Sequence, residues 1–202
     1  MSELSRRFGE IDIYLFDQLL RGRIVPGMRI LDAGCGGGRN LIYFLESPAG
    51  EFEIFGVDAD PKAIASVRRL ARHVAPENFR VEPVEEMSFP DAFFDVVISS
   101  AVLHFAQTTD RFRRMLEGSW RKLKPGGLFF CRLASSIGIE EQIVHIADRR
   151  YLLPDGSERY LADEALLSEM QSRLGARPID PLKTTVVQNL RAMSTWILRK
   201  NN

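Results

Sequence analysis

The sequence predicts an α/β fold: a mostly parallel sheet with helices on both faces, finished by an antiparallel C-terminal hairpin. From residue 28 onward, short apolar segments alternate with helical segments, as in parallel sheets joined by crossover helices. A glycine-rich turn directly follows the first apolar segment. Near the C-terminus, two β-rich segments are separated by three residues only, which is too short for a crossover helix.

Helical segments are recognised by apolar spacing and by their end signals. From Phe8 to Leu20 apolar side chains recur every three or four residues, and Gly22 follows as a stop signal. Asp60 is a favoured N-cap, and Pro61 takes the first helical position after it. The expected helices are residues 8–20, 39–46, 61–73, 109–123 and 163–174.

Short apolar runs between these helices predict the strands of the parallel sheet. The run at residues 95–99 (Asp-Val-Val-Ile-Ser) is rich in β-branched residues, which favour strands. The turn Pro125-Gly126-Gly127 leads into another such run. The expected strands are residues 28–33, 53–57, 79–84, 95–99 and 128–133.

The last third of the chain predicts two antiparallel pairs. A tight turn, Pro154-Asp155-Gly156, separates residues 149–153 from 158–161. The second pair is residues 183–188 and 192–199. We therefore expect a single domain of residues 1–202. Its expected parts are an N-terminal helical lid segment (1–27), a cofactor-binding core (28–133), and a substrate-side insertion with the closing hairpin (134–202).

Charge and cysteine content indicate a cytoplasmic protein with no nucleic-acid or membrane partner. The 27 basic and 27 acidic side chains balance, which gives no support for a polyanion partner. Two cysteines cannot build a disulfide framework, and they indicate a reducing compartment. No apolar run approaches the roughly 20 residues that span a bilayer, and the N-terminus lacks a signal peptide's apolar stretch. The three histidines have no metal-site spacing.

The glycine turn distinguishes between two classes of ligand. A dinucleotide-binding G-x-G-x-x-G would need its third glycine at Arg39 or at Leu41, so that fingerprint fails in both frames. Residues 32–38 read D-x-G-x-G-x-G instead, with Asp32 at the end of the strand. An acid there suits a ligand with a cationic amino group better than a pyrophosphate. The turn therefore favours a nucleoside that carries an amino acid.

Residues 32–38 (Asp-Ala-Gly-Cys-Gly-Gly-Gly) resemble motif I of the class I S-adenosylmethionine-dependent methyltransferases. Four further segments resemble this family in the same order: residues 56–60, 88–95, 96–105 and 123–127. Together they cover about residues 28–133. The resemblance implies a Rossmann-like methyltransferase fold, S-adenosylmethionine as the cofactor and S-adenosylhomocysteine as its product.

The resemblance also implies roles for individual residues. Asp32 would hold the amino group of the cofactor and Arg39 its carboxylate, while Asp58 would accept hydrogen bonds from both ribose hydroxyls. Pro83 stands where many relatives carry an acid that reads adenine, so Glu85, Glu86 or the 84–86 backbone would take that role, with Met87 packing on the ring. The implied cofactor-binding set is Asp32, Gly34, Cys35, Gly36, Arg39, Asn40, Asp58, Ala59, Val84, Glu85, Glu86, Met87 and Ser99.

Three residues are candidates for the acceptor side. His104, just past the fourth expected strand, is the candidate base, because its ordinary pKa lies near neutrality; the alternative is a capping or packing role. Arg132 could bind an acidic substrate group or face solvent. Tyr14 could close over the cofactor or pack at the edge of the core.

The function that these patterns favour is methyl transfer from S-adenosylmethionine to a small-molecule acceptor. Neutral charge and the compact region after the fifth strand favour a small acceptor. Ser99-Ser100-Ala101-Val102 stands where nucleic-acid amino-methyltransferases often carry an N-P-P-Y-like tetrad. The alternatives are a catalytically silent module that binds S-adenosylmethionine or S-adenosylhomocysteine, and a nicotinamide-dependent oxidoreductase. The sequence makes no prediction of acceptor identity or oligomeric state.

Overall fold

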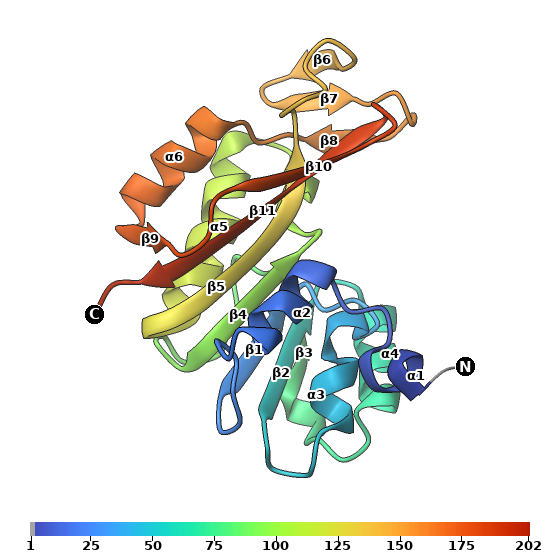
Figure 1. Cartoon of the computed structure of the whole chain (residues 1–202), viewed down its shortest axis with the longest axis vertical. Coiled ribbons are helices and arrows are strands. Elements are labelled where there is room, and N and C mark those ends of the chain that lie inside the picture. Colours follow the sequence, from blue (N-terminus) through green and yellow to red (C-terminus); the bar gives the residue numbers. More distant parts are fainter. Residues whose placement is uncertain (1–2) are drawn as a thin grey trace.

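The computed structural model describes residues 3–202 and confirms the predicted mixed α/β architecture (Figure 1). The central sheet has the order β10-β11-β5-β4-β1-β2-β3, and β9 pairs with β11. Neighbours among β1 to β5 run parallel, whereas β11 runs antiparallel to β5, β9 and β10. The strands of this sheet are β1 (Arg29–Ala33), β2 (Glu53–Asp58), β3 (Phe79–Val81), β4 (Phe94–Ser100), β5 (Leu123–Ser135), β9 (Ala176–Pro178), β10 (Lys183–Val187) and β11 (Arg191–Lys200).

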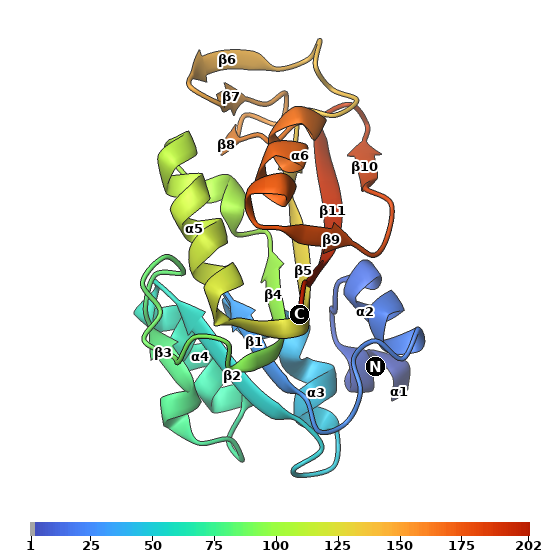
Figure 2. The same cartoon turned by 90° about the vertical axis from the view of Figure 1, so that its left-hand side faces the viewer.

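Apolar side chains cover both faces of the sheet, because helices pack on each side of it (Figure 2). One core cluster joins the sheet to α5 and α6 through residues such as Phe112, Leu116 and Met170. The other joins it to the helices before β3 through Leu15, Phe44 and others. The α-helices are α1 (Glu3–Phe8), α2 (Ile13–Leu20), α3 (Ile42–Glu46), α4 (Pro61–Leu70), α5 (Thr109–Lys122) and α6 (Glu164–Arg173); the 3-10 turns are η1 (Arg39–Leu41), η2 (Pro76–Asn78) and η3 (Leu103–Phe105).

Several predicted boundaries were wrong. The helix expected over residues 8–20 begins only at Ile13, as α2, and a separate helix, α1, ends at Phe8. Gly9 has a φ of 57° between the two helices, and Asp12 caps α2 by accepting a hydrogen bond from the Tyr14 amide. The helix expected from Arg39 begins as the 3-10 turn η1, and α4 ends at Leu70 instead of near residue 73. The third strand is shorter than expected and the fifth longer. Strand β9 was not predicted.

A second, smaller sheet has the order β6-β7-β8, with β6 (Val144–Ala147), β7 (Arg150–Leu152) and β8 (Glu158–Tyr160). The predicted hairpin β7–β8 is confirmed, and β6 adds a strand that was not predicted. In Figure 1 this sheet lies beyond the upper end of β5, near the turn between β10 and β11. No helix within residues 3–202 is long and apolar enough to cross a bilayer.

Candidate functional site

The turn after β1 requires glycine at two positions for different reasons. The Gly34 and Cys35 amides both donate to the Val57 carbonyl, at 2.8 and 2.9 Å, which ties the turn to β2. Gly34 has a φ of 89°, and a Cβ there would lie 2.4 Å from Cγ2 of Val102. Gly36 also has a positive φ, 51°, but a Cβ there would have no protein heavy atom within 4 Å. Gly34 is therefore fixed by packing, whereas Gly36 borders open space.

The Asp58 carboxylate is held at the end of β2 by backbone amides. Its Oδ2 accepts from the Gly36 amide at 2.8 Å, and its Oδ1 accepts from the Asp60 amide at 2.9 Å. Each carboxylate oxygen can accept a second hydrogen bond. Asp58 is therefore fixed in orientation and keeps acceptor capacity on both oxygens, an arrangement that fits two adjacent hydroxyl groups.

Asp32 is a buried carboxylate without a partner. It is 1% exposed, and neither side-chain oxygen has a hydrogen-bond partner within residues 3–202. Burial raises the Asp32 pKa to about 7, opposed by the charge of Arg39 and reinforced by that of Asp58. Burying an unpaired carboxylate costs several kcal/mol. An ammonium group beside Asp32 would remove this cost, so the site fits a ligand with an amino-acid end.

A pocket of about 220 Å³ opens between Asp58 and the start of α5. The Glu85 carboxylate at its wall is paired with the Arg111 guanidinium at 3.0 Å, and the Pro83 ring contributes an apolar surface. The lining residues are Gly34, Asp58, Ala59, Pro83, Val84, Glu85, Ala101, Val102, Phe105, Arg111 and Met115. Its largely apolar lining suits an aromatic ring, and Asp58 at its edge suits a group that carries hydroxyls.

Eight residues of the implied cofactor set do not line this pocket: Asp32, Cys35, Gly36, Arg39, Asn40, Glu86, Met87 and Ser99. Asn40 is buried, and its Oδ1 accepts from the Asp12 amide at 3.1 Å. Burial raises the pKa of the Cys35 thiol, with the Asp32 charge adding to the effect. Met87 packs in the core, and the buried Ser99 hydroxyl has no partner among the described residues. Glu86 is exposed and does not line the pocket either.

A second pocket of about 290 Å³ adjoins the first, because Ala101 lines both. Ala101 has a φ of 62°, a conformation that costs an alanine about 1–3 kcal/mol and is typical of functional sites. The carboxyl ends of β4 and β5 meet the turns of the two C-terminal hairpins here. The lining residues are Arg39, Ser100, Ala101, His104, Arg132, Ala134, Leu153, Asp155, Ser157, Arg159, Val187, Arg191, Ala192 and Met193.

His104 lies in this second pocket as a neutral ring. Its Nδ1 accepts a hydrogen bond from the Ala134 amide at 3.0 Å. Burial, together with a smaller effect of the positive charge of Arg159, lowers the His104 pKa to about 4. With Nδ1 accepting, the neutral ring carries its proton on Nε2. This tautomer donates a hydrogen bond at Nε2 and cannot accept a proton there.

Arg132 and Tyr14 are both engaged within the protein. The Arg132 guanidinium pairs with the buried Asp12 carboxylate at 2.9 Å and lies 5.6 Å from the centroid of the Tyr14 ring. The Tyr14 hydroxyl is hydrogen-bonded to the Thr185 hydroxyl at 2.9 Å. Arg132 lines the second pocket, whereas Tyr14 lines neither pocket and joins α2 to β10.

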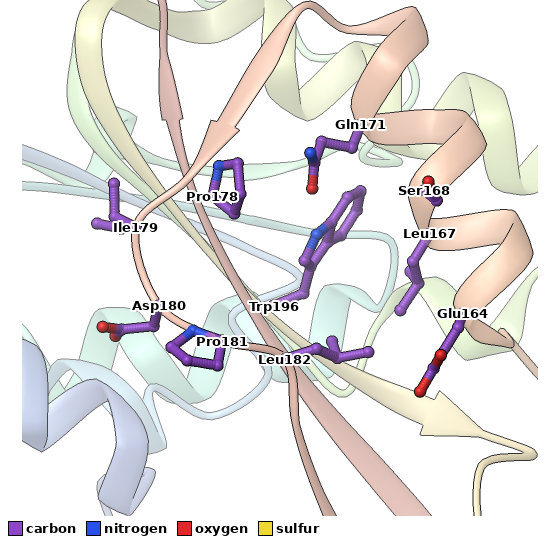
Figure 3. Close-up of a pocket in the computed structure, with 10 residues that line it drawn as sticks. All are labelled: Glu164, Leu167, Ser168, Gln171, Pro178, Ile179, Asp180, Pro181, Leu182 and Trp196. Atoms are coloured by element: carbon purple, nitrogen blue, oxygen red, sulfur yellow. The ribbon is translucent and has the colours of Figure 1, made fainter.

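A further cavity, of about 650 Å³, lies elsewhere, between α6 and the segment that joins β9 to β10 (Figure 3). Its wall includes Trp196, Gln171 and Asp180, and the Asp180 carboxylate is paired with Arg23 at 2.8 Å. None of the predicted site residues lines it. Within residues 3–202, no group of three or more His, Cys, Asp or Glu side chains is placed to hold a metal ion.

Sequence reasoning missed Arg159 and Arg191 in the second pocket and the buried partner Asp12. Arg159 is next to a turn that was recognised, but no local pattern places it near His104, 55 residues earlier in the chain. The pairing of Asp12 with Arg132 joins residues 120 apart. Only the fold brings these side chains together.

The chain belongs to the methyltransferase-domain family, which it matches over residues 31–131, and hence to the Rossmann-like class I methyltransferases that depend on S-adenosylmethionine. It is 35% identical over 106 residues to an uncharacterised methyltransferase of Synechocystis, a match that covers 52% of this chain and 47% of that protein. The chain thus spans about half the length of that relative.

Solved structures show the same fold. A methyltransferase from Methanosarcina mazei has a TM-score of 0.74 at 19% identity, covering 91% of this chain and 97% of the other. The 1,6-didemethyltoxoflavin-N1-methyltransferase of Burkholderia thailandensis, with 1,6-didemethyltoxoflavin and S-adenosylhomocysteine bound, has a TM-score of 0.71 at 22% identity. That match covers 99% of this chain and 82% of the other.

Proposed function

We propose that this protein transfers a methyl group from S-adenosylmethionine to a small-molecule acceptor. The observation that carries the proposal is the buried Asp32 carboxylate, which has no partner within residues 3–202. Beside it, the glycine turn holds the Asp58 carboxylate in an orientation that fits a pair of hydroxyl groups. An amino acid joined to a nucleoside satisfies both groups. A nicotinamide dinucleotide brings no ammonium group for Asp32, and the family match gives it no support.

The two adjoining pockets support a transfer between two bound molecules. S-adenosylmethionine supplies a methyl group already activated on a sulfonium, so alignment is the main task of the protein. The first pocket and Asp58 would position the nucleoside, and Asp32 and Arg39 the amino-acid end. The second pocket meets the first at Ala101, and its volume of about 290 Å³ suits a small acceptor.

The pH dependence of cofactor binding tests this assignment. Asp32 titrates near pH 7 in the free protein, and it must be ionised to pair with an ammonium group. Affinity for S-adenosylhomocysteine should therefore rise by up to about tenfold per unit as the pH increases toward 7, and then level off above about pH 8. His104, with a pKa of about 4, stays neutral across this window. Calorimetry in two buffers of different ionisation enthalpy should show proton release on binding near pH 6.

The matched control is Asp32→Asn, which should bind more weakly and lose this pH dependence. Equal pH dependence in wild type and Asp32→Asn would refute the role of Asp32. Saturable binding of NADH in place of S-adenosylhomocysteine would favour the oxidoreductase. Binding with no release of S-adenosylhomocysteine from S-adenosylmethionine, across a broad set of small acceptors, would favour the catalytically silent module.

We also propose that His104 touches the acceptor as a hydrogen-bond donor rather than as a general base. His104→Asn should keep an acceptor for the Ala134 amide, because the asparagine oxygen replaces Nδ1, while the Nε2 donor is lost. Turnover of any accepted substrate should then fall about tenfold to a hundredfold, the loss expected from one hydrogen bond in a transition state. Affinity for S-adenosylhomocysteine should not change. Wild-type turnover in His104→Asn would assign the ring a structural role.

A further inference from the structure

Four arginines line the second pocket, although the chain as a whole carries no net charge. They come from four separate segments: η1, β5, β8 and β11. Asp155 is the one carboxylate that lines this pocket in the described part of the chain. A neutral protein that gathers guanidinium groups around one cavity creates a local excess of positive charge there. The arginines are Arg39, Arg132, Arg159 and Arg191.

Two of these four arginines have an identified or assigned anionic partner. Arg132 is paired with the buried Asp12 carboxylate at 2.9 Å. Arg39 begins the 3-10 turn η1 after the glycine segment, and its positive charge partly offsets the rise in the Asp32 pKa that burial causes. We assign Arg39 to the carboxylate of the cofactor. Arg159 and Arg191 remain, and no carboxylate within residues 3–202 lies within 4.0 Å of their side-chain nitrogens.

The surroundings of Arg159 and Arg191 leave donor groups available. One Arg159 nitrogen, Nη1, donates to the Glu158 carbonyl at 2.7 Å, and the guanidinium lies 5.2 Å from the centroid of the Phe105 ring. Hydrogen bonds from the Ser157 hydroxyl and amide lower the pKa of Asp155, and the charges of Arg191 and Arg159 add to this effect without a direct ion pair. Two guanidinium groups that line one pocket thus lack a direct anionic partner. An anion from outside the protein would supply one.

The position of these arginines relates them to the acceptor. Both arginines lie on hairpins that line the second pocket, Arg159 on β7–β8 and Arg191 on β10–β11. Neither belongs to the glycine turn, which is assigned to the cofactor. Arg159 is close enough to His104 to lower its pKa, and His104 is near the shared residue Ala101 in sequence and in the pocket. An acceptor whose reacting atom lies by Ala101 would therefore reach the two arginines with its other end.

We propose that the methyl acceptor carries a carboxylate or a phosphate group, which Arg159 and Arg191 bind at the hairpin end of the second pocket. This inference rests on the proposed function. Guanidinium groups bind both anions through charge-assisted, often paired hydrogen bonds. They select against acceptors that lack the anion, because the arginines would then stay unpaired.

Binding of simple anions to the protein saturated with S-adenosylhomocysteine tests the proposal. Phenyl phosphate and benzoate represent the two anions, and benzamide is the neutral control of the same shape. Calorimetric titration should show saturable binding of at least one anion, with benzamide at least about tenfold weaker. The stronger of the two anions identifies the group. In Arg159→Gln and in Arg191→Gln, affinity for that anion should fall about tenfold or more, while affinity for S-adenosylhomocysteine is unchanged.

Arg177→Gln is the matched control, since Arg177 is an exposed arginine on β9 that lines neither pocket. Arg177→Gln should bind phenyl phosphate and benzoate as the wild type does. Equal binding of benzamide, unchanged anion affinity in the Arg159→Gln/Arg191→Gln double variant, or no saturable anion binding would each overturn the proposal. Failure of S-adenosylhomocysteine itself to bind would instead contradict the proposed function, so the two failures are distinguishable.

Discussion

Gly36→Val is expected to abolish measurable binding of S-adenosylhomocysteine while the protein stays folded. The backbone at Gly36 has a φ of 51°, and the space into which a side chain would project contains no protein atom within 4 Å. The Gly36 amide donates to Asp58, the residue assigned to the ribose. A branched side chain there would occupy the space in which the cofactor approaches the backbone. Circular dichroism would report the fold, and calorimetry the loss of binding.

Gly22→Val is the matched control for backbone strain. Gly22 has a φ of 63° and is likewise open around its missing Cβ, but it lies after α2 and lines neither pocket. Both variants should lose about 1–3 kcal/mol of stability from the strained conformation. Only Gly36→Val should lose the cofactor. A folded Gly36→Val protein with wild-type affinity would show that the cofactor does not approach this turn closely.

The parts of the fold that the sequence predicted are those with strong local signals. Apolar runs, caps and turns located β1, β2, β4, α4, α5 and both hairpins to within a few residues. The break at Gly9 was missed, because apolar spacing continues across it while the glycine φ and the Asp12 cap end one helix and start another. Strand β9 has three residues and includes Pro178, and its existence depends on pairing with β11, which no local pattern reports.

In the candidate site too, residues in local motifs could be selected from the sequence, whereas contacts between distant segments could not. The motifs at residues 32–38 and 56–60 were sufficient to select Asp32, Gly34, Gly36 and Asp58 as candidates. Contacts between distant segments were not predictable. The Ala134 amide that determines the tautomer of His104 is 30 residues away. Asn40, also selected for the cofactor, accepts a hydrogen bond from the Asp12 amide 28 residues earlier, a contact that no local pattern predicts. The tertiary fold decides such partners.

Asp58→Ala is expected to weaken S-adenosylhomocysteine binding by about 2–4 kcal/mol, or about thirtyfold to a thousandfold. The substitution removes the acceptors proposed for two ribose hydroxyls. It also removes the acceptors of the Gly36 and Asp60 amides, at 2.8 and 2.9 Å, so the glycine turn loses one of its links to the end of β2, while the two hydrogen bonds to the Val57 carbonyl remain. Both effects act on binding in the same direction. Calorimetric titration measures the sum.

Asp58→Asn and Asp60→Ala separate the two contributions. The asparagine oxygen can still accept from one backbone amide but lacks the charge, so Asp58→Asn should lie between wild type and Asp58→Ala. Asp60 caps α4 by accepting from the Lys62 amide at 2.8 Å, and its side chain lines neither pocket. Asp60→Ala should therefore cost stability of about 1 kcal/mol with little change in affinity. Because the two acids are two residues apart on one loop, equal losses of affinity in Asp58→Ala and Asp60→Ala would mean that loop order, rather than the ribose contact, governs binding.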